Sequence, residues 1–496
     1  MKQENISLLT GQGLLALFLF MCLGGFCALI LGINFYNYQL MQDTFYNVFA
    51  LFNGRLLQDK GMIAASINPL KDIISYLIFS LFNTRPAIYT FMCGTLAGAA
   101  FFTIYRNCLL LFKSYAPLCA AGVLLLFLSG ANTYNLLTAF SAPWVALILL
   151  NLAFYNLFKT GELSIKRAIC AGVLLGAAAA MSNIWFYAAA AIFLCFVFLG
   201  IKNKTDKKII LFFSLSFIAA MAVLLGPWLL FLQAATNHNG SFFSNILSIA
   251  QRRAILNELQ ILKIIFYSAP FISFIVLFSK PLNIMRRKFD ATRLAVSTLC
   301  GAAVLFMLFL LYKIFTSAYS LTADDYAAIS FFSAFSIVFI IYALPKKAFF
   351  IAIAFLPVFL FLKAEPAQFT LKKVQTDFVI RPAQVGIKPG SVILSTYRPH
   401  ISLLLSADKE SKIINMEEQS VYTYKFLNSG ELANTSATVY LVTKHFSKNM
   451  VEGKALDSFI PAKTHSGLKL KNCRHFTDNY FIYINTYNYF CETEKI

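Results

Sequence analysis

Residues 12–33 read QGLLALFLFMCLGGFCALILGI, an apolar stretch without a single charged residue. A transmembrane helix needs about 20 consecutive apolar residues, so this stretch is long enough to cross a bilayer. It is too long for the apolar core of a signal peptide, and no small-residue cleavage site follows it. We therefore expect it to be a retained first membrane helix.

Ten further apolar stretches follow along the chain. They predict spanning helices at 86–105, 114–131, 142–158, 167–182, 184–200, 208–229, 262–279, 294–315, 327–343 and 347–362. Charged residues make up 13% of the sequence, whereas soluble proteins contain about 25%. The predicted fold class is a polytopic α-helical membrane protein with about 11 transmembrane helices in residues 1–363.

Basic residues predict which helix ends face the cytoplasm, because cytoplasmic loops carry an excess of Lys and Arg. With the N-terminus inside, the short cytoplasmic stretches hold 17 basic residues, Arg106 among them, and the opposite face holds nine. An odd number of spans then places residues 364–496 outside. The predicted location is a bacterial inner membrane, crossed many times, with a cytoplasmic N-terminus and a periplasmic C-terminal domain.

The net charge of +20 comes mostly from the membrane loops. It indicates membrane topology and contact with anionic lipid. Nucleic-acid binding would need basic residues clustered on a folded domain with aromatic platforms, which the tail does not offer. The sequence therefore predicts a membrane-lipid partner and no nucleic acid.

Residues 364–496 have the composition of a soluble domain. The runs VILSTY, TVYLVT and YFIYINTY alternate with Gly, Pro and Asn, which favours an α+β or mostly β fold. Its only two cysteines, Cys473 and Cys491, are expected to form a disulfide in an oxidising compartment. The first outer loop, residues 34–85, is predicted to contain an apolar helix that lies along the membrane surface.

Carboxylates are scarce before residue 364, so those on the outer face can be enumerated. They are Asp43, Asp59, Asp72, Glu258, Asp324 and Asp325. A base acting on that face would come from this set. The sequence shows no cluster with metal-ligand spacing and no glycine-rich nucleotide loop, so a bound nucleotide is not supported, and the participation of a divalent metal is left open.

The first outer loop carries a resemblance to a known family. It contains Gln42-Asp43-Thr44-Phe45-Tyr46, Asn53-Gly54, Asn68-Pro69, a short apolar helix and Arg85-Pro86. Later, Gly226-Pro227-Trp228 closes the seventh span and Gln251-Arg252 follows it. This order of motifs resembles the GT-C superfamily of membrane glycosyltransferases, which includes aminoarabinose transferases and protein O-mannosyltransferases.

The sequence also departs from that family. Thr44 follows the aspartate where a Glu is commoner, and no Asp precedes Pro143. Ser182-Asn183 stands where aminoarabinose transferases have Thr-Lys. These departures leave the substrate and the metal dependence open.

The resemblance implies a glycosyltransferase that takes its sugar from a polyprenyl-phosphate donor. The transfer is expected to be inverting, onto an envelope glycan, lipid or protein on the periplasmic face. A base must take the proton of the acceptor hydroxyl, and Asp43, just past the first helix, is the predicted base. Cations must hold the departing phosphate. The candidates for that role are Arg252, Arg253, Lys313, Arg85 and Lys71.

Each of these residues also has a purely structural interpretation. Asp43 could face solvent or cap a helix, and Arg252 and Arg253 could be interfacial anchors. Lys313 could extend its ammonium group to the membrane surface. Asp324 and Asp325, the secondary acid candidates, could cap the tenth span against the helix dipole.

Three rival functions remain open from the sequence. The first is a transporter or flippase of a lipid-linked glycan, which would need charged residues deep inside the spans. The second is an O-antigen ligase or polymerase, which usually has its large outer loop late in the chain. The third is a receptor-like scaffold that acts through its tail.

Overall fold

The computed structural model describes the helical core and the main strands of the tail. It describes residues 11–34, 86–129, 142–159, 163–236, 261–279, 284, 288–289, 292–316, 323–363, 388–395, 412–415, 435–445, 451–459, 467–478 and 486–495. The chain divides into two compact units, one that contains the described helices and one that contains the sheet, with a division between Lys372 and Lys373.

Each stretch predicted to span contains a described helix. The helices are α1 (Gly11–Asn34), α5 (Pro86–Phe112), α6 (Ala116–Ser129), α8 (Ala142–Phe158), α9 (Ile165–Ala179), α10 (Asn183–Lys202), α11 (Lys207–Thr236), α13 (Ile261–Phe278), α15 (Arg293–Thr316), α16 (Ala323–Ala343) and α17 (Lys346–Lys363). Among the described residues, six helical stretches are long and apolar enough to cross a membrane, one of which joins α5 to α6. The structure therefore shows a helical protein with several helices that can span a membrane. The number of eleven transmembrane helices stays a prediction.

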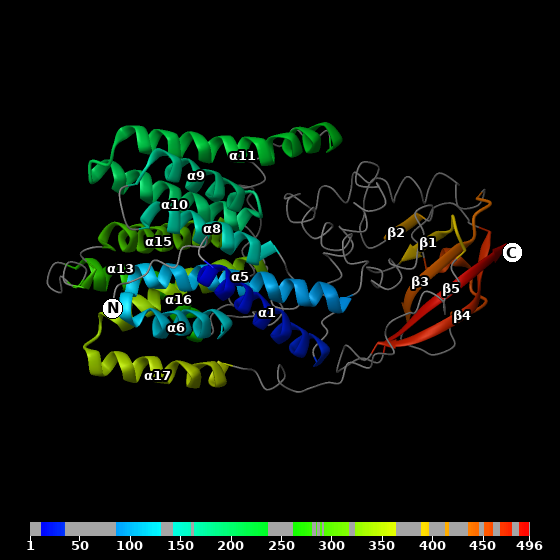
Figure 1. Ribbon diagram of the computed structural model, residues 1–496. Helices are drawn as coiled ribbons and strands as arrows, with labels where there is room; N and C mark the ends of the chain where they lie inside the picture. The colour runs from blue at the N-terminus through cyan, green and yellow to red at the C-terminus, as the bar shows by residue number, and fades with distance from the viewer. Residues whose placement is uncertain are drawn as a thin grey trace. The chain divides into compact units, whose positions relative to one another are not determined.

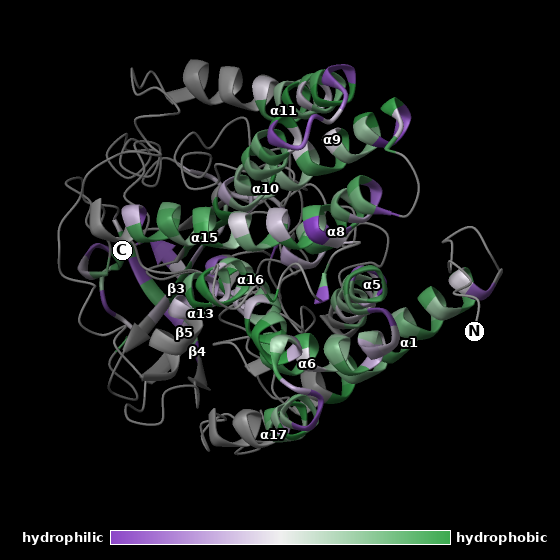
Figure 2. Ribbon diagram, turned by 90° about the vertical axis from the view of Figure 1, so that its left-hand side faces the viewer, coloured by the Kyte–Doolittle hydropathy of each residue, from purple (hydrophilic) through white to green (hydrophobic). Residues whose placement is uncertain are grey.

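The helices run side by side in the first unit (Figure 1). Figure 2 looks nearly along them, and α16 lies in the middle, in contact with α6, α8, α10, α13, α15 and α17. In the apolar part of α16, 72% of the residues are buried, against 17% in α1 and in α11. The outward side chains of α1 and α11 are apolar, as expected of helices that face lipid.

Two helix pairs pack backbone to backbone at glycines. A Cβ at Gly98 of α5 would overlap the Phe20 carbonyl oxygen of α1, and a Cβ at Gly172 of α9 would overlap Ser216 of α11. Gly94 and Gly176 lie one turn away on the same helices, also in close contact. Both pairs therefore use the spacing of small residues four apart that lets membrane helices approach closely.

Arg106 differs from its predicted position in a cytoplasmic loop. α5 continues to Phe112, so Arg106 lies inside the helix and is only 4% exposed. Its guanidinium carbon is 3.8 Å from the centre of the Tyr155 ring of α8. A guanidinium stacks favourably on an aromatic face, so this contact offsets part of the cost of burying the charge, although Nε and Nη1 have no hydrogen-bond partner among the described residues.

Two other cations bind helix C-termini at the predicted cytoplasmic face. Lys288 donates hydrogen bonds to the carbonyl oxygens of Tyr342 and Leu344, at 2.8 and 2.7 Å, at the C-terminal end of α16. Arg167 donates to the carbonyl oxygens of Asn156 and Lys159 at the end of α8. These basic residues satisfy terminal carbonyl groups that the helices leave unpaired.

The tail forms a five-stranded mixed sheet in the order β2-β1-β3-β5-β4. The strands are β1 (Val392–Ser395), β2 (Lys412–Asn415), β3 (Val439–His445), β4 (Leu468–Asp478) and β5 (Thr486–Lys495). β1 pairs in parallel with β2 and β3, whereas β5 pairs antiparallel with β3 and β4. Leu394, Leu441, Leu470 and Cys491 belong to the buried core on this sheet.

Candidate functional site

Five of the eight residues predicted for the membrane site lie outside the described residues. This group comprises Asp43, Lys71, Arg85, Arg252 and Arg253. Asp324 belongs to α16, next to Asp325. Lys313 and Asp325 are therefore the two predicted membrane-site residues whose surroundings can be analysed.

Lys313 and Asp325 come together with Tyr187, a residue that the sequence analysis did not single out. Lys313 lies in the last turn of α15, and its ammonium nitrogen is 5.5 Å from the centre of the Tyr187 ring on α10. Asp325, in the first turn of α16, is completely buried and interacts electrostatically with both Lys313 and Tyr187. The three residues thus form one polar cluster with two charged members, which we call the outer cluster because it lies at the predicted outer face.

The helix ends explain why this cluster is tolerated in a membrane protein. A carboxylate near a helix N-terminus and an ammonium near a C-terminus both interact favourably with the helix dipole. Burial of a charge is costly unless an opposite charge or a polar partner compensates it. A cation held in this way at the predicted outer edge of the membrane can attract an anionic ligand such as a phosphate.

Two buried polar atoms lie beside the start of α10, a few residues from Tyr187. Within the described part of the chain, neither the Ser182 hydroxyl nor the indole nitrogen of Trp185 has a hydrogen-bond partner. Trp185 is completely buried. A buried polar group without a partner is rare in a folded protein and indicates a place for water or a ligand.

The sequence offered little reason to choose Tyr187. The chain contains 23 tyrosines, and Tyr187 lies in an apolar stretch with no motif around it. Only the packing of α10 against α15 and α16 brings its ring to Lys313. The nearest signal was the Ser182-Asn183 break between two spans, which marks the predicted outer end of α10.

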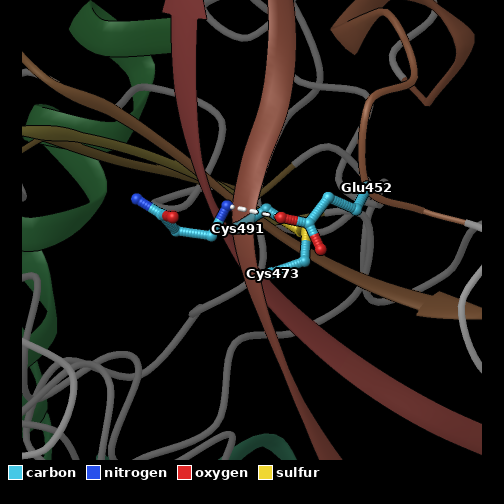
Figure 3. Close-up of a disulfide and its surroundings, with 4 residues drawn as sticks. Glu452, Cys473 and Cys491 are labelled. Atoms are coloured by element: carbon cyan, nitrogen blue, oxygen red, sulfur yellow. Dashed lines mark hydrogen bonds between the residues drawn. A yellow bond between two sulfur atoms is a disulfide. The ribbon is translucent and has the colours of Figure 1, made fainter.

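The second unit contains the disulfide between Cys473 and Cys491, the pair expected from the sequence, with a sulfur–sulfur distance of 2.05 Å. Figure 3 shows it beside Glu452, whose carboxylate accepts a hydrogen bond from a neighbouring backbone amide. Among the described residues, no three His, Cys, Asp or Glu side chains come together in a way that could hold a metal ion.

Comparison with known proteins identifies the fold. No family model and no curated protein matches the sequence. The structure is similar to the crystal structure of ArnT from Cupriavidus metallidurans bound to undecaprenyl phosphate, with a TM-score of 0.55, over 97% of this chain and 98% of that chain. The sequence identity is 11%. The apo state of the same ArnT gives a TM-score of 0.46, over 76% of this chain and 82% of that chain, at 11% identity.

At this identity, the likeness shows the fold alone. The chain shares the fold of this ArnT along nearly its whole length. The resemblance inferred from the motifs of the first outer loop is therefore confirmed at the level of the fold.

Proposed function

We propose that this chain is a membrane glycosyltransferase that moves a sugar from a polyprenyl-phosphate donor to an acceptor of the cell envelope. The observation that carries the proposal is the fold, which is shared over 97% of the chain with an ArnT crystallised with undecaprenyl phosphate. The outer cluster supports it, because Lys313 is a cation at the predicted outer edge of the membrane. The donor sugar arrives already attached to lipid, so no nucleotide site is needed.

The reaction that we propose balances in atoms and in charge. The Asp43 carboxylate takes the proton of an acceptor hydroxyl while the hydroxyl oxygen attacks the anomeric carbon of the donor sugar. The bond between that carbon and the phosphate oxygen breaks, and its electron pair stays on the phosphate. The products are an inverted glycoside, a protonated Asp43 and a polyprenyl phosphate with one more negative charge.

The growing charge on the phosphate needs cations close to it. We assign this role to Arg252, with Arg253, Arg85 and Lys71 in support, and to Lys313 of the outer cluster. The Tyr187 ring and the Asp325 carboxylate hold the Lys313 ammonium in place. Asp325 is thereby given a positioning role, which leaves Asp43 as the base.

The experiment that tests this function is sugar transfer by purified protein from a synthetic polyprenyl-phosphate sugar. Asp43→Asn keeps the size of the side chain but removes its basicity, so transfer should fall by about 10²–10⁴. Asp59→Asn is a matched control, because it removes a carboxylate from the same predicted loop, and it should leave transfer near that of the wild type. Wild-type turnover in Asp43→Asn would remove this residue from the mechanism.

Arg252 can be tested in the same assay. Arg252→Ala should weaken donor binding and slow transfer, because the phosphate loses a bidentate donor. Arg252→Lys should restore part of the loss, since a lysine supplies the charge but not the planar pair of donors. Equal activity of the alanine variant and the wild type would refute this assignment.

A lipid-linked glycan flippase is the second candidate, and one observation favours it. Arg106, Asn107 and Asn151 are buried polar residues of α5 and α8, and Asn107 donates a 2.7 Å hydrogen bond to the Asn151 side chain. A transport pathway requires such groups inside the bundle. Reconstituted protein that moves a fluorescent polyprenyl-phosphate sugar across liposomes, but transfers no sugar, would favour this function.

A further inference from the structure

The second unit contains a cavity beside the disulfide. Its volume is about 420 Å³, and Lys388, Glu452, Asn472, Arg474, Glu492 and Phe490 line it. Small-molecule sites are typically about 300–1,000 Å³ in volume, so this cavity is large enough for a ligand of one or two sugar units. Every lining residue belongs to the tail, which makes the cavity separate from the outer cluster.

A β-bulge creates one wall of this cavity. Lys471 pairs with Glu492 and Arg474 pairs with Phe490, so Asn472 and Cys473 together stand opposite Cys491. Asn472 has a φ of 50°, a left-handed conformation that Asn tolerates better than most residues with a side chain. Bulges often re-aim side chains beside functional sites, and this one brings Asn472 to the wall of the cavity.

Hydrogen bonds fix the polar groups of that wall. The backbone amide of Asn472 donates to Glu452 at 3.1 Å, the contact drawn in Figure 3, and its side-chain amide donates to Glu492 at 3.3 Å. Lys388 forms a 3.1 Å ion pair with the other oxygen of Glu492. The disulfide lies in the same bulge and ties β4 to β5. Donors and acceptors therefore lie side by side next to the disulfide.

The net charge of the cavity and the aromatic ring at its base limit the chemical class of ligand that it can bind. Two cations, Lys388 and Arg474, are balanced by two carboxylates, Glu452 and Glu492. A strongly charged ligand therefore gains little net attraction, whereas a hydroxyl group can both donate to the carboxylates and accept from the cations and the amide. Phe490 is stacked on Tyr440 at 5.0 Å between ring centres and nearly buried, which gives a firm apolar floor.

We propose that this cavity binds a neutral carbohydrate unit, whose neighbouring hydroxyl groups bridge Asn472, Glu492 and Lys388. A sugar is the ligand class that offers several hydroxyl groups without net charge in a volume of this size. The assignment makes the tail a glycan-binding domain. It concerns binding alone and holds whether or not the membrane unit transfers sugar.

The experiment uses the full chain in lipid nanodiscs and saturation-transfer NMR with three probes. Maltotriose is neutral, a chitosan trimer is cationic and trigalacturonate is anionic. Maltotriose is expected to receive saturation at millimolar concentration and to bind more tightly than either charged probe. Weaker binding of maltotriose than of both charged trimers, or no transfer to maltotriose at all, would overturn the proposal.

Two variants locate the binding site. Asn472→Gly keeps the left-handed backbone accessible and removes only the side chain, and Glu492→Gln removes the charge at nearly constant shape. Each should weaken maltotriose binding by about tenfold or more, the usual effect of losing a hydrogen bond to a charged group. Glu494→Gln is the matched control, because Glu494 is on the same strand and also ion-paired but does not line the cavity. Unchanged binding in both test variants would place the sugar elsewhere and refute the assignment.

Discussion

Cys473 of β4 faces Cys491 of β5 because β4 supplies two residues at the bulge where β5 supplies one. Side chains alternate between the two faces of a strand, so one extra residue changes which side chain lies beside the partner strand. With the bulge, Cys473 reaches Cys491 while Asn472 turns toward Glu452 and Glu492. The covalent bond and the strand register therefore support each other.

The disulfide should stabilise the tail. It links residues separated by 18 positions, and the chain-entropy model gives about 3 kcal/mol for a loop of this length. The double variant Cys473→Ser/Cys491→Ser should lower the protection of β5 against hydrogen exchange, whereas Cys170→Ser, an exposed cysteine of α9, should not. Peptide mapping without reduction should find the two cysteines linked. Alkylation of both thiols without prior reduction would contradict an oxidising location.

The predicted topology can be tested with fusions. A reporter attached after Lys363 or at the C-terminus should be active outside the cytoplasm, and one attached after Lys208 or Lys288 should be active inside. The reason is the excess of basic residues in the stretches predicted to be cytoplasmic. A C-terminus located inside would refute the proposed orientation and the outer active face with it.

Lys313 should contribute to donor binding. Lys313→Met removes the ammonium group from the outer cluster and should raise the KM for the donor by about 10- to 100-fold, the value of one hydrogen bond between charged groups. Lys347→Met, an exposed lysine at the start of α17, is the control and should leave the KM unchanged. Asp325→Asn should lower thermal stability in detergent more than the double variant Lys313→Met/Asp325→Asn does, because the single change removes the carboxylate beside Lys313 but keeps its charge. An unaltered KM in Lys313→Met would exclude the phosphate role.

Packing between α1 and α5 should not tolerate even one methyl group. Gly98→Ala places a Cβ against the backbone of Phe20, and overpacking of this kind costs about 1–3 kcal/mol. Gly226→Ala is the control, because nothing lies within 4 Å of a Cβ at that position. Thermal denaturation in detergent should separate the two variants. A Gly98→Ala protein as stable as Gly226→Ala would mean that the helices are farther apart than the structure places them.

Acid should destabilise the sheet through Glu492 and Glu494. Burial alone would raise the pKa of Glu492, but hydrogen bonds from Lys388 and Asn472 hold it below its ordinary value of 4.5. Hydrogen bonds from Lys471 and Lys469 likewise lower the pKa of Glu494. The unfolded chain therefore binds more protons than the folded one in acid, so the stabilisation is complete above about pH 4.5 and lost as the pH falls through the folded values.

Hydrogen exchange of the β5 peptide, corrected for intrinsic rates, measures this dependence. Protection should fall between about pH 5 and pH 3 in the wild type. It should fall less in Glu492→Gln and least in the double variant with Glu494→Gln. The same slope in all three proteins would show that these carboxylates do not couple to folding.

The helices were predictable from the sequence because their signal is local. The length and composition of an apolar run such as 184–200 are enough to predict a helix there, and the structure places α10 at Asn183–Lys202. The two predicted cysteines also meet in the structure, since a lone pair in the tail leaves only one partner for each. Features of this kind need no knowledge of which elements pack together.

Packing and register were not predictable in the same way. Arg106 was expected in a loop, because a charge usually ends an apolar run, and no local signal reveals the Tyr155 ring that accommodates it. Tyr187 joins Lys313 only through the contact of α10 with α15. The bulge at Asn472 depends on how β4 pairs with β5, and the strand-prone pattern of β4 does not contain that information.

The close contact of α1 with α5 also has a consequence for biosynthesis. Phe112, the last residue of α5, is added to the chain 78 residues after Asn34, the last residue of α1. Ribosomes add about 5–20 residues per second, so synthesis of α5 ends about 4–16 seconds after that of α1. During that interval its glycine face must rest against lipid. The large exposed side chains of α1 are apolar, so the helix can stay in the bilayer before α5 is complete.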